Sequence, residues 1–179
     1  RVLLLEVQAL TSPSQIPAPR RVVNGVDYNR LLMLAAVASR RSGLELSSQD
    51  IIVNVAGGFK ISEPAADLPL VLSMASSLYN CPLDSAVFAF GEVGLSGEIR
   101  AVSQVQRRIT ESARLGLTKC ILPESCLEGL SVPEGMEIAG VKTLRQAINA
   151  GLTQNLDRNH SEQWLPDAVS NPKEALNPS

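Results

Sequence analysis

The chain has 179 residues, the size of one domain or of one domain with a tail, and 45% of them are hydrophobic, so it can bury a core. Its net charge of −2 gives no overall attraction for nucleic acid, so any basic surface must be local. Aromatic residues make up only 3%, which leaves the core to aliphatic side chains and predicts no aromatic platform for stacking exposed bases.

The cysteine and histidine content limits the kinds of catalysis and metal binding that the chain could carry out. The cysteines Cys81, Cys120 and Cys126 are odd in number and lack C-x-x-C spacing, which favours reduced thiols. His160 is the only histidine, so the sequence excludes nearly all histidine-based catalysis and predicts no metal site. No run approaches the roughly 20 apolar residues of a membrane span, and there is no signal-peptide pattern. We expect a reducing compartment such as the cytoplasm and, because the chain starts with Arg1 rather than Met, a piece cut from a longer polypeptide.

Predicted strands and helices alternate along the chain. Apolar runs predict strands at residues 2–10, 19–27, 50–58, 86–93, 97–102, 119–123 and 137–141, with the turn 94–97 forming a hairpin. Helical spacing predicts helices over 28–41, 65–79, 103–115 and 143–150. Asp27 and Ser62 are the predicted N-caps of the first two helices, and Gly43 is the predicted end of the first.

This alternation predicts a mixed α/β (α+β) fold, with a mixed sheet and packed helices, over residues 1–152. Residues 153–179 are polar and contain prolines without sustained periodicity, so we expect a disordered C-terminal tail. The glycine pair in VAGGFK lacks the spacing of a phosphate-binding loop, so no nucleotide or other cofactor is expected in this chain.

The stretch KISEPAADL, residues 60–68, follows a predicted strand and two glycines and leads into a helix. A strand, a tight corner and a helix start commonly present a nucleophile. Here the corner offers only Glu63, Pro64, Ala65, Ala66 and Asp67, so the platform carries an alanine where a nucleophile would stand.

Two long stretches carry a family resemblance. NVAGGFKISEPAADLPLVLSMASSL and FGEVGLSGEIRAVSQVQRRITESARLGLTKCILPES resemble the proteolytic domain of Lon proteases. They resemble more closely the Lon-like C-terminal domain of the RadA (Sms) family of RecA-paralogue DNA-repair ATPases. EVQAL, NRLLMLAAV and EGMEIAGVKTLRQAI also fit that family, so the resemblance covers about residues 1–150 and implies a Lon-type fold.

The resemblance implies that the catalytic serine–lysine dyad is degenerate. Ala65 stands at the serine position, Gln106 at the lysine position, and Asp67 replaces a glycine. A methyl group cannot attack a carbonyl and a neutral amide cannot take its proton, so no peptide cleavage is expected. Replacement by Ser62 or Ser73 with Lys60 would need hydrogen-bond geometry that neighbouring residues rarely supply; we expect a helix cap and a helix interior there.

The placement of basic residues is the feature of the sequence that indicates a binding function. The predicted DNA-binding residues are Arg20, Arg21, Arg30, Lys60, Arg100, Arg107 and Arg108. On the helix 103–115, a predicted polar face opposes an apolar one; the polar set is Gln104, Arg107, Arg108, Glu111 and Arg114, and the apolar set is Val102, Val105, Ile109 and Ala113. Arginine outnumbers lysine, which favours phosphate or carboxylate pairing. Ordinary solvated arginines and subunit contacts are the alternatives.

The resemblance implies a non-proteolytic scaffold that forms a homo-oligomeric ring, expected to be a hexamer, and contacts single-stranded or branched DNA through its backbone. For the full protein it implies ATP-driven branch migration in recombinational repair, with a RecA-type recombinase as a partner. ATP, Mg and Zn would belong to upstream domains. The alternatives are an oligomerisation module without DNA contact and an active serine–lysine peptidase.

Overall fold

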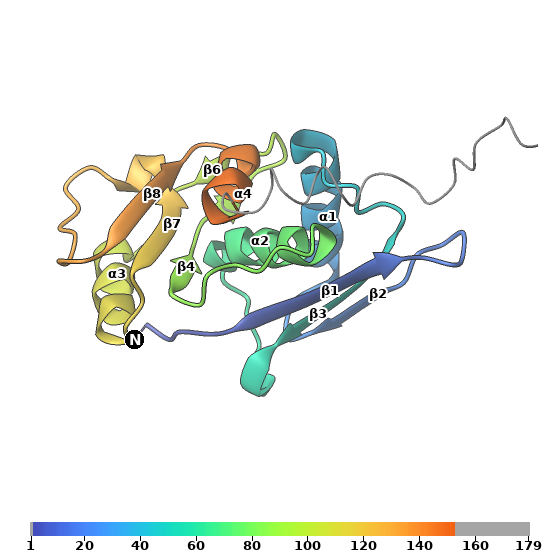
Figure 1. The fold of residues 1–179 in the computed structure, drawn as a ribbon, viewed down its shortest axis with the longest axis horizontal. Coiled ribbons are helices and arrows are strands. Elements are labelled where there is room, and N and C mark those ends of the chain that lie inside the picture. The colour runs from blue at the N-terminus through green and yellow to red at the C-terminus, as the bar shows by residue number, and fades with distance from the viewer. Residues whose placement is uncertain (1, 153–179) are drawn as a thin grey trace, which may run out of the picture.

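The computed structural model describes residues 2–152, and they form a mixed α/β fold that confirms the predicted class (Figure 1). The predicted tail at 153–179, with His160, lies outside the described residues. Within the part that the structure describes, no helix is both long and apolar enough to cross a membrane.

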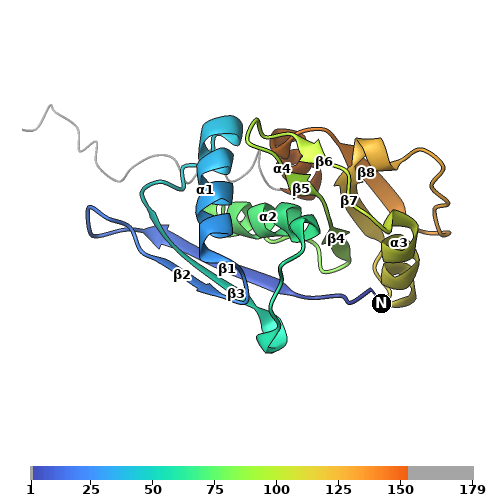
Figure 2. The same ribbon diagram turned by 180° about the vertical axis from the view of Figure 1, so that it is seen from behind.

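The first sheet has the strand order β1-β3-β2, with β1 (Val7–Pro13) antiparallel and β2 (Arg21–Asn24) parallel to the central β3 (Gln49–Val55). Alternate residues of β3 are buried, as its β-branched sequence predicts for a strand with one covered face. The helices α1 (Tyr28–Ser42) and α2 (Asp67–Leu78) lie on that covered face (Figure 2).

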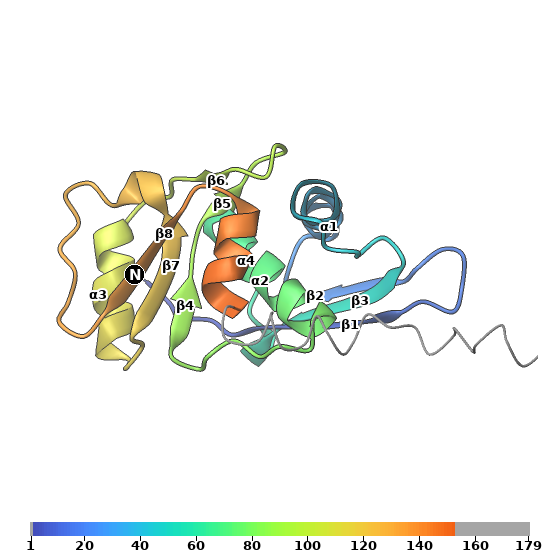
Figure 3. The ribbon, with the colours of Figure 1, turned by 45° about the horizontal axis from the view of Figure 1, so that its top comes forward.

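The second sheet is fully parallel, with the order β4-β7-β8, and consists of β4 (Val87–Ala89), β7 (Lys119–Pro123) and β8 (Glu137–Val141). Helix α3 (Val105–Arg114) packs on one face and α4 (Leu144–Leu152) on the other (Figure 3). A small third sheet is the hairpin of β5 (Glu92–Val93) and β6 (Ile99–Arg100).

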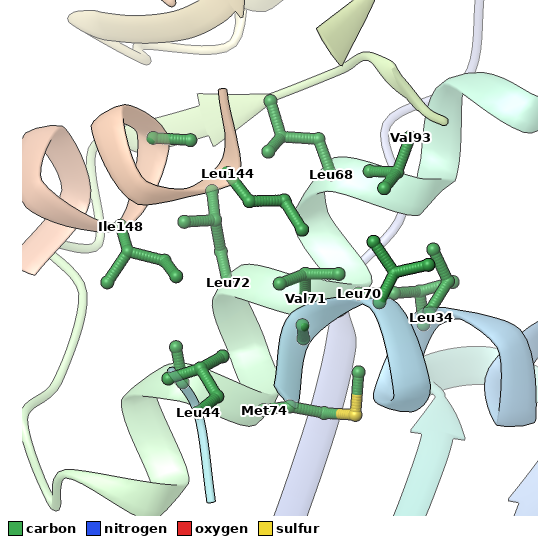
Figure 4. Close-up of a cluster of buried hydrophobic side chains, with 14 of the residues drawn as sticks. Leu34, Leu44, Leu68, Leu70, Val71, Leu72, Met74, Val93, Leu144 and Ile148 are labelled. Carbon is green, nitrogen blue, oxygen red and sulfur yellow. The ribbon is translucent and has the colours of Figure 1, made fainter. Parts of the chain in front are cut away.

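Two clusters of buried side chains hold these layers together. The larger gathers aliphatic residues of α1, α2, α4 and both main sheets, and Figure 4 draws Leu34, Leu72 and Leu144 among its members. The smaller lies between α3 and β7 and includes Ala65, Phe90 and Ile109. The apolar face predicted for α3 is confirmed, because Val102, Val105 and Ala113 also pack against this second cluster.

Helix α1 begins and ends where local signals predict. Asp27 accepts a hydrogen bond from the backbone N–H of Arg30 at 2.8 Å, as an N-cap does. Gly43 has a φ of 74°, the left-handed conformation that ends many helices. Both predictions are confirmed.

Three predicted strands have different boundaries in the structure. The predicted strand 2–10 pairs only from Val7 onward, because its partner β3 ends at Val55 and the chain then turns through the short helix η1 (Ala56–Gly58). For the same reason the predicted strand 50–58 ends early, with Gly57 in a left-handed conformation. The predicted strand 19–27 is limited to Arg21–Asn24, because Gly25 takes a φ of 85°.

The predicted strand 86–93 is divided between two sheets. The backbone N–H of Phe90 still bonds to Ile121, but the N–H of Gly91 donates to the carbonyl of Ala65 at 2.9 Å. A Cβ at Gly91 would lie 2.7 Å from Ile99, so only glycine permits this close crossing. The predicted hairpin therefore contains Glu92–Val93 and Ile99–Arg100 alone.

Candidate functional site

The corner between β3 and α2 is built as the sequence predicts, apart from its cap. Pro64 opens the single 3₁₀ turn η2 (Pro64–Ala66), and α2 follows directly. The predicted N-cap Ser62 makes no capping bond; Glu63 occupies the cap position of η2, and its carboxylate pairs with Arg108 instead. Ala65 is buried in the second cluster with its carbonyl bonded to Gly91, so the corner presents a packed methyl group.

Asp67, which the resemblance places where Lon has a glycine, forms a buried ion pair. Its side chain is 2% exposed. The carboxylate accepts hydrogen bonds from Nε of Arg30 at 2.8 Å, from Nη2 of Arg30, and from the backbone N–H of Val93 at 3.0 Å. The hydrogen bond to Asp67 is the main cause that raises the pKa of Arg30. This carboxylate therefore joins α1, α2 and β5, and Arg30 stabilises the fold through it.

Arg108 is also held by contacts within the described chain. Its guanidinium pairs with Glu63, donates to the carbonyl of Ser103 at 2.9 Å and lies 5.6 Å from the ring centroid of Phe90. The side chain is only 16% exposed, and burial lowers its pKa. Its predicted place on a solvent-facing polar surface is wrong, because the charge is satisfied by groups next to the corner.

Gln106, at the degenerate lysine position, holds a loop. Its Nε2 donates to the carbonyl of Ser131 at 2.8 Å, and its Oε1 accepts the backbone N–H of the same residue at 2.9 Å. Both ends of the amide are therefore used, which a lysine amine could not reproduce because it has no acceptor.

A cavity of about 500 Å³ lies beside Ala65. The segment 2–7 forms one wall, α2 and β4 contribute others, and Arg108 reaches it from α3. Gln106 does not line it, so the two degenerate positions face different surroundings.

The residues considered for a substitute dyad are placed as follows. Ser73 donates to the backbone carbonyl of Pro69 at 2.6 Å, as a helix-interior serine does. Ser62 and Lys60 are both exposed. Among residues 2–152 no serine hydroxyl is hydrogen-bonded to a lysine amine.

The other predicted cations differ in the partners that they have within the chain. Arg20 pairs with Asp50 at 3.3 Å, and Arg100 pairs with Glu98 at 3.0 Å, both at the surface. Arg21 donates to backbone carbonyls, including that of Leu46 at 3.1 Å.

Lys60 and Arg107 are exposed, and no hydrogen bond or ion pair joins either to another residue in the described part of the chain. Within the described part of the chain, these two are therefore the cations of the predicted set that have no hydrogen-bond or ion-pair partner.

Two further cations and two rings are exposed. Arg40, in the arginine-rich stretch 18–41, has no hydrogen-bond or ion-pair partner in the described chain, and Arg145 interacts electrostatically with Tyr79. Sequence reasoning did not single out Phe59 and Tyr28, which are each 47% exposed. The signal for Phe59 was its place directly after two glycines and before a lysine.

Within residues 2–152, the cysteines and carboxylates do not gather into a set of metal ligands. Cys81, Cys120 and Cys126 are free thiols, and burial is the main cause that raises the pKa of Cys120 above its ordinary value. Residues 2–152 contain no group of three or more His, Cys, Asp or Glu side chains that could hold a metal ion.

Comparison with known proteins gives the class first. Residues 28–126 match the family model of subunit ChlI of Mg-chelatase, which covers more than half of the sequence, so the chain belongs to this family. The matched segment runs from α1 to the turn after β7 and contains the whole corner.

Curated relatives give the particular resemblance. The chain is 44% identical over 152 residues to DNA repair protein RadA of Bacillus subtilis (strain 168), covering 85% of this chain and 33% of the relative. It is 48% identical over 149 residues to DNA repair protein RadA of Escherichia coli (strain K12), covering 83% and 32%. The predicted resemblance to RadA is confirmed, and the chain spans about a third of the length of the curated relatives it matches.

Proposed function

We propose that this chain is a non-proteolytic, Lon-type scaffold domain of a RadA-type DNA-repair protein, which assembles with copies of itself into a hexameric ring and contacts the DNA backbone. In the full protein the expected activity is ATP-driven branch migration, with Mg, Zn and a RecA-type recombinase engaged by parts outside this chain. The expected location is the bacterial cytoplasm or an organellar matrix.

One observation carries the non-proteolytic part of the proposal. The position that the resemblance gives to the nucleophile is the buried Ala65, and the neighbouring Asp67 and Arg108 are bonded to protein atoms. Gln106, at the position that the resemblance gives to the lysine, is bonded to Ser131 and holds a separate loop. Neither position offers a group that could attack a carbonyl or accept its proton, which supports a structural use of the corner.

The DNA contact rests on the relatives and on two available cations. The relatives' printed name is DNA repair protein, and Lys60 and Arg107 are exposed and form no ion pair with a carboxylate in the described part of the chain. Such cations bind phosphates without reading base sequence, so binding would be sensitive to salt.

Pure oligomerisation is the second candidate function, and one observation favours it. Five of the seven predicted DNA-binding residues are engaged within the chain, namely Arg20, Arg21, Arg30, Arg100 and Arg108. If the remaining two contribute nothing, the DNA contacts would belong to other parts of the full protein.

The test replaces Lys60 and Arg107 together with glutamine and measures the mass by light scattering and DNA retention by anisotropy. The proposal expects an unchanged oligomer mass, with DNA affinity reduced several-fold and a salt slope lowered by about one for each phosphate that the variant no longer neutralises. Unchanged DNA affinity favours the oligomerisation module, and a monomeric wild-type chain contradicts the ring. The matched control is Lys142→Gln, at an exposed lysine whose ion pair with Glu124 lies at the surface.

The peptidase alternative has its own test. We expect neither turnover of casein or fluorogenic peptides at high protein concentration nor labelling by serine-reactive probes. Measurable turnover that survives repurification would contradict the proposed loss of proteolysis.

A further inference from the structure

The loop at residues 56–60, named here the Phe59 loop, projects from the end of β3 away from both main sheets (Figures 1 and 2). The Phe59 side chain in it is 47% exposed, although the other two phenylalanines are at most 9% exposed. Lys60 follows directly and is also exposed. The loop therefore presents an aromatic ring and a cation to solvent side by side in sequence.

The base of the loop is held firmly. The backbone N–H of Ile61 donates to the carbonyl of Gly25 at 2.7 Å, and Val26 and Ile61 form a parallel bridge. A Cβ at Gly25 would lie 2.4 Å from the Phe59 carbonyl, so the two segments meet as closely as backbone allows.

The ring itself rests on a glycine. Gly57 and Gly58 have φ values of 78° and 72°, and a Cβ at Gly57 would lie 3.1 Å from the Phe59 ring. The missing side chain therefore lets the ring lie against the backbone. A ring supported in this way loses little conformational freedom when a second flat group stacks on it.

The surroundings favour an anionic, aromatic ligand. Tyr28, also 47% exposed, lies two residues from the Val26–Ile61 bridge, as Phe59 does on the other chain segment. Of the neighbouring carboxylates, Asp27 caps α1 and Glu63 pairs with Arg108. No ion pair joins Lys60 to a carboxylate in the described part of the chain, and Lys60 directly follows the exposed Phe59 ring in sequence.

We propose that the Phe59 loop is a contact site for single-stranded DNA, in which an unpaired base stacks on the Phe59 ring and Lys60 binds an adjacent phosphate. Stacking on aromatic side chains combined with backbone-directed cations is how proteins bind single strands without sequence preference. In duplex DNA the base faces are already stacked, so the ring has little to offer there. This inference rests on the proposed DNA contact and adds to it strand selectivity.

The experiment uses the full 179-residue chain, a fluorescently labelled 20-nucleotide oligothymidine and a 20-base-pair duplex, with affinities measured by anisotropy at one salt concentration. Phe59→Ala is expected to weaken oligothymidine binding about tenfold while duplex binding changes less than twofold. Phe59→Leu keeps apolar bulk but should behave like alanine, whereas Phe59→Trp should retain wild-type affinity. Leu95→Ala, at a residue 69% exposed in the hairpin turn, is the matched control and should change neither affinity.

The outcomes separate this inference from the proposed function. If the wild type binds DNA and Phe59→Ala binds both probes as tightly as the wild type does, the stacking contact is wrong and the DNA contact stands. Equal losses on both probes also overturn the strand selectivity. If Phe59→Ala instead lowers the oligomer mass, the loop is a subunit contact. If the assembled wild type binds neither probe, the proposed DNA contact fails, and this inference fails with it.

Discussion

The corner at residues 63–67 and the Phe59 loop are neighbours in sequence, yet they use their side chains in opposite ways. At the corner, Glu63 pairs with Arg108 and Asp67 pairs with Arg30, and of the two carboxylates Asp67 is buried whereas Glu63 is 54% exposed. In the loop, Phe59 and Lys60 face solvent without a described partner. The first region stabilises the domain, and the second is available to a ligand.

This difference shows why arginine placement alone is a poor guide to a binding surface. A guanidinium that donates to a buried carboxylate cannot bind a phosphate without leaving that carboxylate unpaired, which is costly. An exposed lysine with no partner carries no such penalty. Burial and partners therefore decide which cations of this chain are available.

The largest effect should come from breaking the corner at Asp67. Asp67→Ala leaves the Arg30 guanidinium and the Val93 N–H without their acceptor, and we expect a loss of about 3–5 kcal/mol in the free energy of unfolding. Urea unfolding followed by circular dichroism measures it.

Lys142→Ala is the control for this measurement, because its ion pair with Glu124 is exposed and should contribute less than about 1 kcal/mol. If Asp67→Ala loses no more than this control, the corner is not held by the ion pair.

The second effect compares adjacent arginines on α3. Arg108→Ala removes bonds to Glu63 and Ser103, and we expect a loss of about 2 kcal/mol in stability. Arg107→Ala should change stability by less than about 0.5 kcal/mol and should act on DNA affinity instead. Thermal unfolding and anisotropy of both variants, run side by side, check this division. Similar stability losses for the two variants would contradict it.

The third effect tests the degenerate lysine position. Gln106→Ala removes two hydrogen bonds to the Ser131 backbone and should cost about 1 kcal/mol, with faster amide exchange around Ser131. Gln106→Lys should loosen the same loop, because an ammonium cannot accept the Ser131 N–H. Hydrogen exchange read by mass spectrometry reports both. Unchanged protection in this loop would mean that the amide does not hold it.

The smallest effect concerns pH and the surface carboxylate of Glu98. Its pKa is lowered by hydrogen bonding from its own backbone N–H, and also by Arg100 and by the N–H of Ser96. A lowered pKa in the folded state means that the stabilisation is present above the ordinary glutamate pKa and is lost as the pH falls through the folded value. The Tm difference between wild type and Glu98→Gln should therefore shrink from pH 7 to pH 3. A difference that stays constant would contradict this.

Local patterns predicted much of the fold. The strands 119–123 and 137–141 appear at the predicted residues, and Asp27 and Gly43 bound α1, because these signals depend on neighbours in sequence. The division of the strand 86–93 could not be predicted in this way. It depends on Ile99 and Ala65 lying close to Gly91, which only the tertiary structure brings about.

The candidate site was predictable in its composition but not in its contacts. The alanine at position 65 can be read from the sequence. The partner of Arg30 is 37 residues away and that of Arg108 is 45 residues away, and helical spacing carries no information about such pairs. Exposure of Phe59 likewise depends on how the Gly25 segment closes the base of its loop.

The two separate clusters of buried side chains imply that the domain can open in parts. Ala65 belongs to the cluster around α3 and the adjacent Ala66 packs against the other, so the boundary between them falls at one peptide bond. Segments that share few buried contacts exchange their amide hydrogens as independent cooperative units. Helix α3 should therefore detach and reclose while α2 stays protected, giving Arg107 a mobility that the rigid sheet beneath Lys60 does not share.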